Sequence, residues 1–221
     1  MPVNKNRYNQ ILDRLKFKNA LLVAVSKMKP VEVISELYDL GQRDFGENYV
    51  QELVDKELKL PKDIRWHFIG HLQTNKVKYI APFVHLIHGV DSVKLLKEIN
   101  KQAEKNKRVI NVLLQVHIAT EETKFGLDED ELLQVIHSEE VKILSNILIS
   151  GLMGMGSFSD DANQVREEFQ TLKLLFEKHS EVQAPNIKLQ TLSMGMSGDY
   201  EVALEKGSNM VRIGSLLFGS R

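Results

Sequence analysis

The chain has 221 residues, with 29 basic and 30 acidic side chains, and its net charge of -1 gives no general attraction to nucleic acid or to an anionic membrane. It contains no cysteine, which excludes disulfides, zinc–thiolate sites and cysteine nucleophiles. Its length suits one large domain, and its 43 % of hydrophobic residues can fill a sizeable core.

The N-terminal segment predicts a helix over residues 4–16 and lacks the apolar core of a secretory signal. No apolar run in the sequence reaches the length that a membrane-spanning helix needs. We therefore expect a soluble, cytoplasmic protein that does not insert into membranes and does not bind nucleic acid.

Short apolar runs, most of them rich in Val, Ile and Leu, follow this helix at intervals along the chain. Most show no alternation of polar and apolar residues, which is typical of parallel strands covered on both faces. In chain order the predicted strands are Leu21–Val25, Arg43–Phe45 (the weakest), Trp66–Ile69, Phe83–Ile87, Val109–Val116, Ile147–Met153, Leu189–Leu192 and Met210–Ile213.

Longer stretches between these runs carry apolar residues at helical spacing. The repeating positions are Val33, Ile34, Leu37 and Leu40; Val50, Leu53, Val54 and Leu58; Leu96, Ile99 and Ala103; and Val165, Phe169, Leu172 and Phe176. Ser92 and Asp128 are expected N-caps, and Glu131 would complete a capping box with Asp128. Eight strand–helix units favour a single (β/α)8 barrel domain over residues 1–221 with an extra N-terminal helix. An open doubly wound sheet is the alternative.

Both architectures bind ligands at the carboxyl ends of their strands. Lys27 follows the first predicted strand directly. A lysine at the mouth of a barrel can be partly desolvated, which favours the neutral amine that attacks an aldehyde. The alternative for Lys27 is a solvated surface lysine.

Two loops of small residues follow the seventh and eighth predicted strands. Residues 193–198 read SMGMSG, and Gly214-Ser215 precedes a short apolar stretch. Barrels often bind phosphate in these two loops, where a glycine lets the ligand approach and backbone N–H groups point at it. Ordinary turns would have a similar composition.

Three further features allow more than one interpretation. Arg212 lies inside an apolar run, so it either faces a ligand or forms a buried ion pair. His67 and His71 have a spacing that binds metal on a helix, but their segment reads as a strand, so a hydrogen-bonding or surface role is favoured and no metal site is predicted. The glycines of residues 151–156 do not match a dinucleotide fingerprint.

Several longer motifs point to one family. They are Ala24-Val-Ser-Lys27, Phe45-Gly-Glu-Asn48, the segment 67–76 (HFIGHLQTNK), the segment 121–126 (EETKFG), Gly151-Leu-Met153, the segment 192–197 (LSMGMS) and Val211-Arg-Ile-Gly-Ser215. In this order and at these separations they resemble the pyridoxal phosphate homeostasis proteins, from about residue 20 to the end of the sequence.

The resemblance implies a barrel similar to the N-terminal domain of alanine racemase, with pyridoxal 5'-phosphate held as a Schiff base on one lysine. It implies the following site residues: Lys27 for the Schiff base, Ser197, Gly214 and Ser215 for the phosphate, Arg212 for the pyridine nitrogen, and Asn48 and His71 as pocket residues. Family members are regarded as reservoirs, carriers or regulators of the cofactor, and the resemblance points to a monomer whose partners are the cofactor and apo-enzymes that need it.

The same resemblance implies that the protein is not an enzyme. Alanine racemases complete their site with a tyrosine from a second domain, of which this sequence shows no trace. The alternative function is a small pyridoxal-dependent amino-acid racemase, and a third is a barrel that binds sugar phosphates without pyridoxal.

Overall fold

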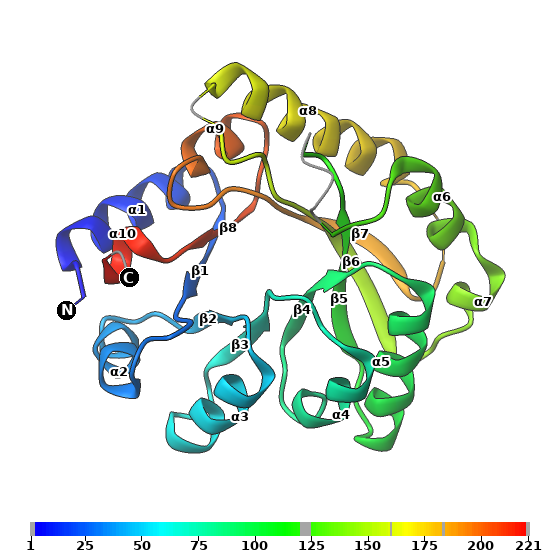
Figure 1. Ribbon diagram of the computed structural model, residues 1–221, viewed down its shortest axis with the longest axis horizontal. Helices are drawn as coiled ribbons and strands as arrows, with labels where there is room; N and C mark the ends of the chain where they lie inside the picture. Colours follow the sequence, from blue (N-terminus) through cyan, green and yellow to red (C-terminus); the bar gives the residue numbers. More distant parts are fainter. Residues whose placement is uncertain (1–2, 120–124, 160, 183, 220–221) are drawn as a thin grey trace.

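A computed structural model describes residues 3–119, 125–159, 161–182 and 184–219. Its eight parallel strands pair in chain order and close into a barrel, so the predicted barrel is confirmed against the open sheet (Figure 1). The strands are β1 Leu21–Val25, β2 Asp44–Glu47, β3 Arg65–Phe68, β4 Leu86–Val90, β5 Ile110–Val116, β6 Ile147–Gly154, β7 Ile187–Ser193 and β8 Met210–Ile213.

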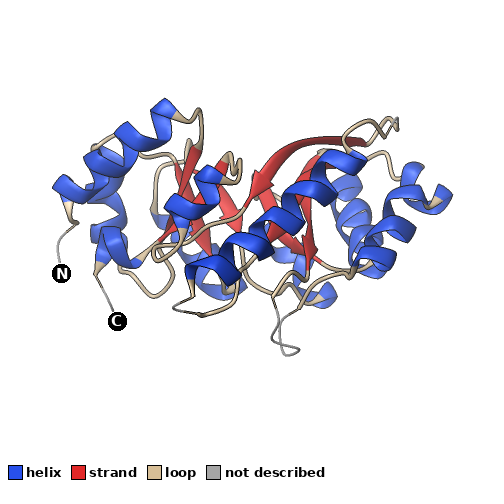
Figure 2. Cartoon of the chain, turned by 90° about the horizontal axis from the view of Figure 1, so that it is seen from above, coloured by secondary structure: helices blue, strands red, loops and turns tan. Residues whose placement is uncertain are grey.

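The helices lie outside the strands, as Figure 2 shows. They are α1 Lys5–Phe17, α2 Val31–Asp39, α3 Val50–Lys59, η1 Thr74–Lys76, α4 Val77–Ile80, α5 Val93–Lys105, α6 Glu129–His137, α7 Glu139–Lys142, α8 Ala162–His179, α9 Tyr200–Glu205 and α10 Ser215–Phe218. Ser92 caps α5, and Asp128 with Glu131 forms the predicted capping box of α6. Residues 121–124 of the segment 121–126 lie outside the described residues. No helix in the described part of the chain is long and apolar enough to cross a membrane.

Two sequence predictions were wrong in detail. The run Phe83–Ile87 is not a strand from its start, because the N–H groups of Phe83 and Val84 bond to the Ile80 carbonyl and close the turn after α4. Val84 is apolar because it packs in the core, and β4 begins at Leu86. Leu58 was expected on the buried face of α3, yet 70 % of it is exposed.

Alternation along each strand divides the core into two parts. Outward residues such as Phe45, Trp66 and Ile87 pack against the helices in one large apolar cluster. Inward residues form a second, smaller cluster of Val23, Leu86, Leu113, Met153 and Met210. The apolar runs therefore lack alternation because both faces of each strand are covered.

The N-terminal helix α1 packs beside α10, and the two lie together at one edge of the barrel in both views. The backbone N–H of Asn4 donates to the carbonyl of Leu217 at 2.9 Å, and Tyr8, Ile11 and Leu15 of α1 are buried. This contact ties the start of the described chain to the helix that follows β8, the strand whose end forms part of the candidate site below.

Close packing between β6 and β7 gives a first prediction. Gly151 pairs with Thr191, and a Cβ added at Gly151 would overlap the Thr191 carbonyl oxygen. We expect Gly151→Ala to lower the free energy of unfolding by about 3 kcal/mol, because the backbone of two strands must separate. Denaturant unfolding measures this, with Gly198→Ala as the control, since a Cβ there meets no atom within 4 Å. Equal stability of both variants would contradict the packing described.

Candidate functional site

A cavity of about 630 Å³ opens at the carboxyl ends of the strands. Its wall is assembled from the segments after β1, β2, β3, β6, β7 and β8, with one residue from α8. The lining residues are Val25, Lys27, Lys29, Asn48, Ile69, Met155, Ser157, Phe158, Ser159, Val165, Met196, Ser197, Gly198, Asp199, Arg212, Gly214, Ser215 and Gly219.

The structure brings together six of the seven predicted site residues in this wall: Lys27, Asn48, Ser197, Arg212, Gly214 and Ser215. His71 lies outside the wall. Its imidazole stacks on Phe125, with ring centroids 4.6 Å apart, and its Nδ1 lies 3.5 Å from a carboxylate oxygen of Asp91. His71 does not line the cavity, so its predicted role as a pocket residue stays a prediction.

The segment that carries Lys27 is hydrogen-bonded to an ion cluster formed by Lys56, Glu47 and Glu52. Lys56 on α3 donates to carboxylate oxygens of Glu47 at 2.8 Å and Glu52 at 2.7 Å, and to the carbonyl of Ser26 at 2.8 Å. The Ser26 hydroxyl donates to Glu47 at 2.6 Å, and the backbone N–H of Met28 to Glu52 at 2.6 Å. Both neighbours of Lys27 are therefore fixed by side chains of β2 and α3.

The same cluster depends on charge balance. Burial raises the pKa of Glu47 above 4.5, and the ammonium of Lys56 opposes that shift. Met28 has a left-handed φ of 59°, a conformation that side chains other than glycine rarely adopt. The bond from its N–H to Glu52 accompanies this strained turn, so the cluster stabilises the backbone on which Lys27 is mounted.

One part of the cavity wall is formed by the segments after β7 and β8. The Ser197 hydroxyl accepts from the Gly214 N–H at 3.3 Å and joins the two segments. The backbone N–H of Ser215 has no acceptor among the described residues. Lys29 adds a positive charge here, with its ammonium 3.1 Å from the Phe218 carbonyl. These groups can bind an anion.

Arg212 is 4 % exposed and lines the cavity from β8. Its guanidinium donates to the Ser193 hydroxyl at 2.6 Å and to the Gly154 carbonyl at 3.0 Å. Burial lowers its pKa to about 10, so it remains a cation at neutral pH. Among the described residues its partners are neutral, so the alternative of a buried ion pair does not account for it.

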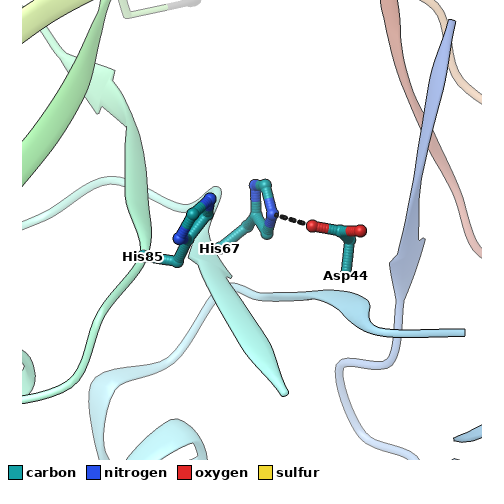
Figure 3. Close-up of side chains that lie close together, drawn as sticks. All are labelled: Asp44, His67 and His85. Atoms are coloured by element: carbon teal, nitrogen blue, oxygen red, sulfur yellow. Dashed lines mark hydrogen bonds and ion pairs between the residues drawn. The ribbon is translucent and has the colours of Figure 1, made fainter. Parts of the chain in front are cut away.

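A separate group lies toward the amino ends of the strands. Asp44, His67 and His85 place nitrogen and oxygen atoms within 4.8 Å of one another, the one group in the described part of the chain whose spacing would suit a metal ion. Figure 3 shows His67 turned toward Asp44, to which its Nε2 bonds at 3.0 Å. Arg65 already bonds to both carboxylate oxygens of Asp44. The hydrogen-bonding interpretation of His67 is confirmed.

Sequence reasoning missed several residues of the site. Lys29 lines the cavity two residues beyond Lys27, and Lys56, which supports the Lys27 segment, is buried although lysine is almost always exposed. Lys29 lies in the loop after β1 and Lys56 on α3, so no strand pattern marks them. Polar residues inside apolar strands were a signal only for His88 and Ser193. Asn75 and Lys76, which follow β3, do not line the cavity.

This chain is similar to known proteins over most of its length. The family model for the alanine racemase N-terminal domain matches residues 4–221. The pyridoxal phosphate homeostasis protein of Aquifex aeolicus is 45 % identical over 204 residues, covering 91 % of this chain and 87 % of that protein. The protein of that name from Schizosaccharomyces pombe is 41 % identical, covering 96 % and 89 %. The structure of Synechococcus elongatus PipY with PLP bound superposes with a TM-score of 0.87 at 32 % identity, covering 97 % and 99 %.

The buried ion cluster gives a second prediction. Lys56→Met leaves Glu47 as an uncompensated buried carboxylate, and we expect the free energy of unfolding to fall by about 4 kcal/mol near pH 8. Removing Lys56 raises the pKa of Glu47 further, so protonation in the folded state relieves this cost as the pH falls through that pKa. The deficit relative to the unmodified protein should therefore shrink by about pH 5.

Two variants serve as controls for this measurement. Lys62→Met removes an exposed partner of Glu57 and should change stability by less than about 0.5 kcal/mol. Glu47→Gln combined with Lys56→Met should recover part of the loss. A deficit of Lys56→Met that does not depend on pH would contradict the assignment of charge to Glu47.

Proposed function

The chain belongs to the pyridoxal phosphate homeostasis protein family, and from this premise we propose that it binds pyridoxal 5'-phosphate in the cavity and holds it as a Schiff base on Lys27. The observation that carries the proposal is the convergence of Lys27, Arg212 and the Ser197–Gly214–Ser215 segments on one wall at the carboxyl ends of the strands. We propose that the protein is a reservoir, carrier or regulator of the cofactor.

The donor set of the cavity fits this ligand. A phosphate needs N–H and hydroxyl donors, which Ser197 and Ser215 supply beside the ammonium of Lys29. The Asn48 Oδ1 atom is buried and has no hydrogen-bond partner among the described residues, so it can accept a hydrogen bond from a ligand. Buried polar atoms are normally paired, and a hydroxyl-bearing ligand would satisfy this one.

Arg212 determines which chemistry the site favours. Pyridoxal phosphate acts as an electron sink, most strongly when its pyridine nitrogen is protonated. A guanidinium with a pKa of about 10 can donate a hydrogen bond to that nitrogen but offers no carboxylate to protonate it. This arrangement favours holding the cofactor over stabilising a carbanion.

The cavity wall supports the proposal that the protein is a carrier. Among the described lining residues there is no tyrosine or histidine, and the titratable groups are Lys27, Lys29, Asp199 and Arg212. The Asp199 carboxylate accepts a hydrogen bond from the Met196 N–H. A racemase needs an acid or base on each face of the substrate, and this wall provides few candidates. Delivery to apo-enzymes, a monomeric state and a cytoplasmic location stay predictions.

The Schiff base gives a third prediction. The purified protein should turn yellow with pyridoxal phosphate, and borohydride should trap the ligand on the peptide containing Lys27. Lys27→Ala should fold with unchanged circular dichroism and lose both the visible band and the trapped adduct. Lys29→Ala is the matched control: Lys29 lines the same cavity beside the phosphate donors, so its loss should raise the ligand concentration needed for saturation but leave the band and the Lys27 adduct in place at saturation. An adduct retained in Lys27→Ala would remove the assignment.

The proposed lack of catalytic turnover of amino acids gives a fourth prediction. The loaded protein, incubated in D2O with L-alanine, L-serine and a wider amino-acid panel, should show α-proton exchange no faster than Lys27→Ala. The reason is the unprotonated pyridine nitrogen combined with the lack of a second acid–base group. Exchange that depends on Lys27 would establish the racemase alternative instead.

A further inference from the structure

A chain of buried polar side chains crosses the interior of the barrel from β2 to β8. The His67 Nε2 atom lies 3.0 Å from Asp44 Oδ1, and His67 Nδ1 lies 2.9 Å from His88 Nε2. His88 Nδ1 lies 3.3 Å from the Ser193 hydroxyl, which in turn accepts from Arg212 at 2.6 Å. Each of these five residues is at most 4 % exposed.

The protons of this chain can be placed by elimination. The Asp44 carboxylate only accepts, so His67 Nε2 carries a proton, as the bond in Figure 3 indicates. If His67 is neutral, its Nδ1 accepts, and His88 Nε2 is therefore the donor of their bond. If His88 is also neutral, its Nδ1 accepts from the Ser193 hydroxyl. In every hydrogen bond of the series, the donor is then the residue nearer Arg212 and the acceptor is the residue nearer Asp44.

The charges around the chain favour these neutral imidazoles. Burial lowers the pKa of His67, and burial, the neighbouring His67 imidazole and the charge of Arg212 lower the pKa of His88 well below its usual value. Burial alone would raise the pKa of Asp44, but bonds from His67 and Arg65 bring it to about 2.

Four charged or titratable groups belong to this series of hydrogen bonds or act on its members. They are Asp44 on β2, Arg65 on β3, His85 before β4, and Asp199 near Arg212. Adding a proton to His67 would reverse its bond with His88 and make Ser193 accept from both sides. The ordered arrangement therefore requires a negative Asp44 and two neutral histidines, which the pairing with Arg65 supports.

We propose that Asp44, His67, His88 and Ser193 form one proton-ordered chain that positions Arg212 at the wall of the cavity and so determines how its guanidinium meets the ligand. This inference rests on the proposed function for the nature of the ligand but not for the order of the protons. The four are positioning residues, because within the chain only Arg212 lines the cavity.

The proton order is tested without any cofactor. Long-range 1H–15N NMR spectra of the ligand-free protein should show His67 and His88 both neutral and both as the Nε2–H tautomer between about pH 6 and about pH 8. Ser193→Ala should shift the His88 Nδ1 resonance, because it removes the donor to that atom, and Ser193→Thr should restore it. An Nδ1–H tautomer or a cationic ring at either histidine would overturn the proposal.

The effect on the ligand is tested with matched variants. Ser193→Ala should weaken pyridoxal phosphate binding about tenfold, the loss expected for one charge-assisted hydrogen bond, and should shift the pH midpoint of the bound cofactor's absorbance. His88→Leu should act in the same direction through Ser193. Ser208→Ala is the control, because this buried serine bonds only to backbone carbonyls, and it should leave affinity within about twofold.

The outcomes separate the two proposals. If Ser193→Ala and His88→Leu match the unmodified protein in affinity and absorbance while Lys27→Ala loses its band, the positioning role fails and the proposed function stands. If the tautomers are as expected but no variant or unmodified protein binds pyridoxal phosphate, the proposed function fails and the ordered chain stands. Ser193→Thr keeps the binding test usable if Ser193→Ala folds poorly, because it should retain affinity and spectrum.

Discussion

The burial of the Arg212 charge inside the barrel is the constraint on which much of the structure depends. A guanidinium that cannot reach bulk water needs acceptors, and it finds them in Ser193 and the Gly154 carbonyl. Ser193 is itself buried and bonds onward to His88, so the requirement extends through His67 to Asp44. One buried charge at the cavity therefore accounts for polar residues on four other strands.

The two ends of the barrel differ in structure: the amino ends of the strands are closed by an ion pair, and the carboxyl ends open into the cavity. At the amino ends Arg65, which is half exposed, neutralises Asp44, and the chain that begins there is closed to water. At the carboxyl ends the barrel opens into the cavity lined by Lys27, Arg212 and the segments after β7 and β8. The apolar cluster of Val23, Leu86, Leu113, Met153 and Met210 fills the space around the polar chain, which keeps its hydrogen bonds strong.

Lys27 and Arg212 are supported in different ways. The Lys27 segment is fixed by hydrogen bonds to an ion cluster: Lys56 donates to the carbonyl of Ser26, and Glu52 accepts from the N–H of Met28, on the two sides of the lysine. Arg212 is fixed through its own side chain by neutral partners. The structure therefore fixes the backbone at Lys27 and the direction of the side chain at Arg212.

The sequence by itself determined the order of the strand–helix units, the position of Lys27 after the first strand and the two small-residue segments, because these follow from periodicity along the chain. Closure of the eight strands into a barrel was decided by the tertiary structure. It also marked Arg212 as unusual but left an ion pair or a ligand as explanations. Only the tertiary structure showed that His88 and Ser193 lie beside it and that His71 lies outside the cavity, because inward-facing contacts join residues 105 positions apart, as between His88 and Ser193. The start of β4 was misjudged for the same reason, since Val84 is apolar through packing that local periodicity does not distinguish from a strand.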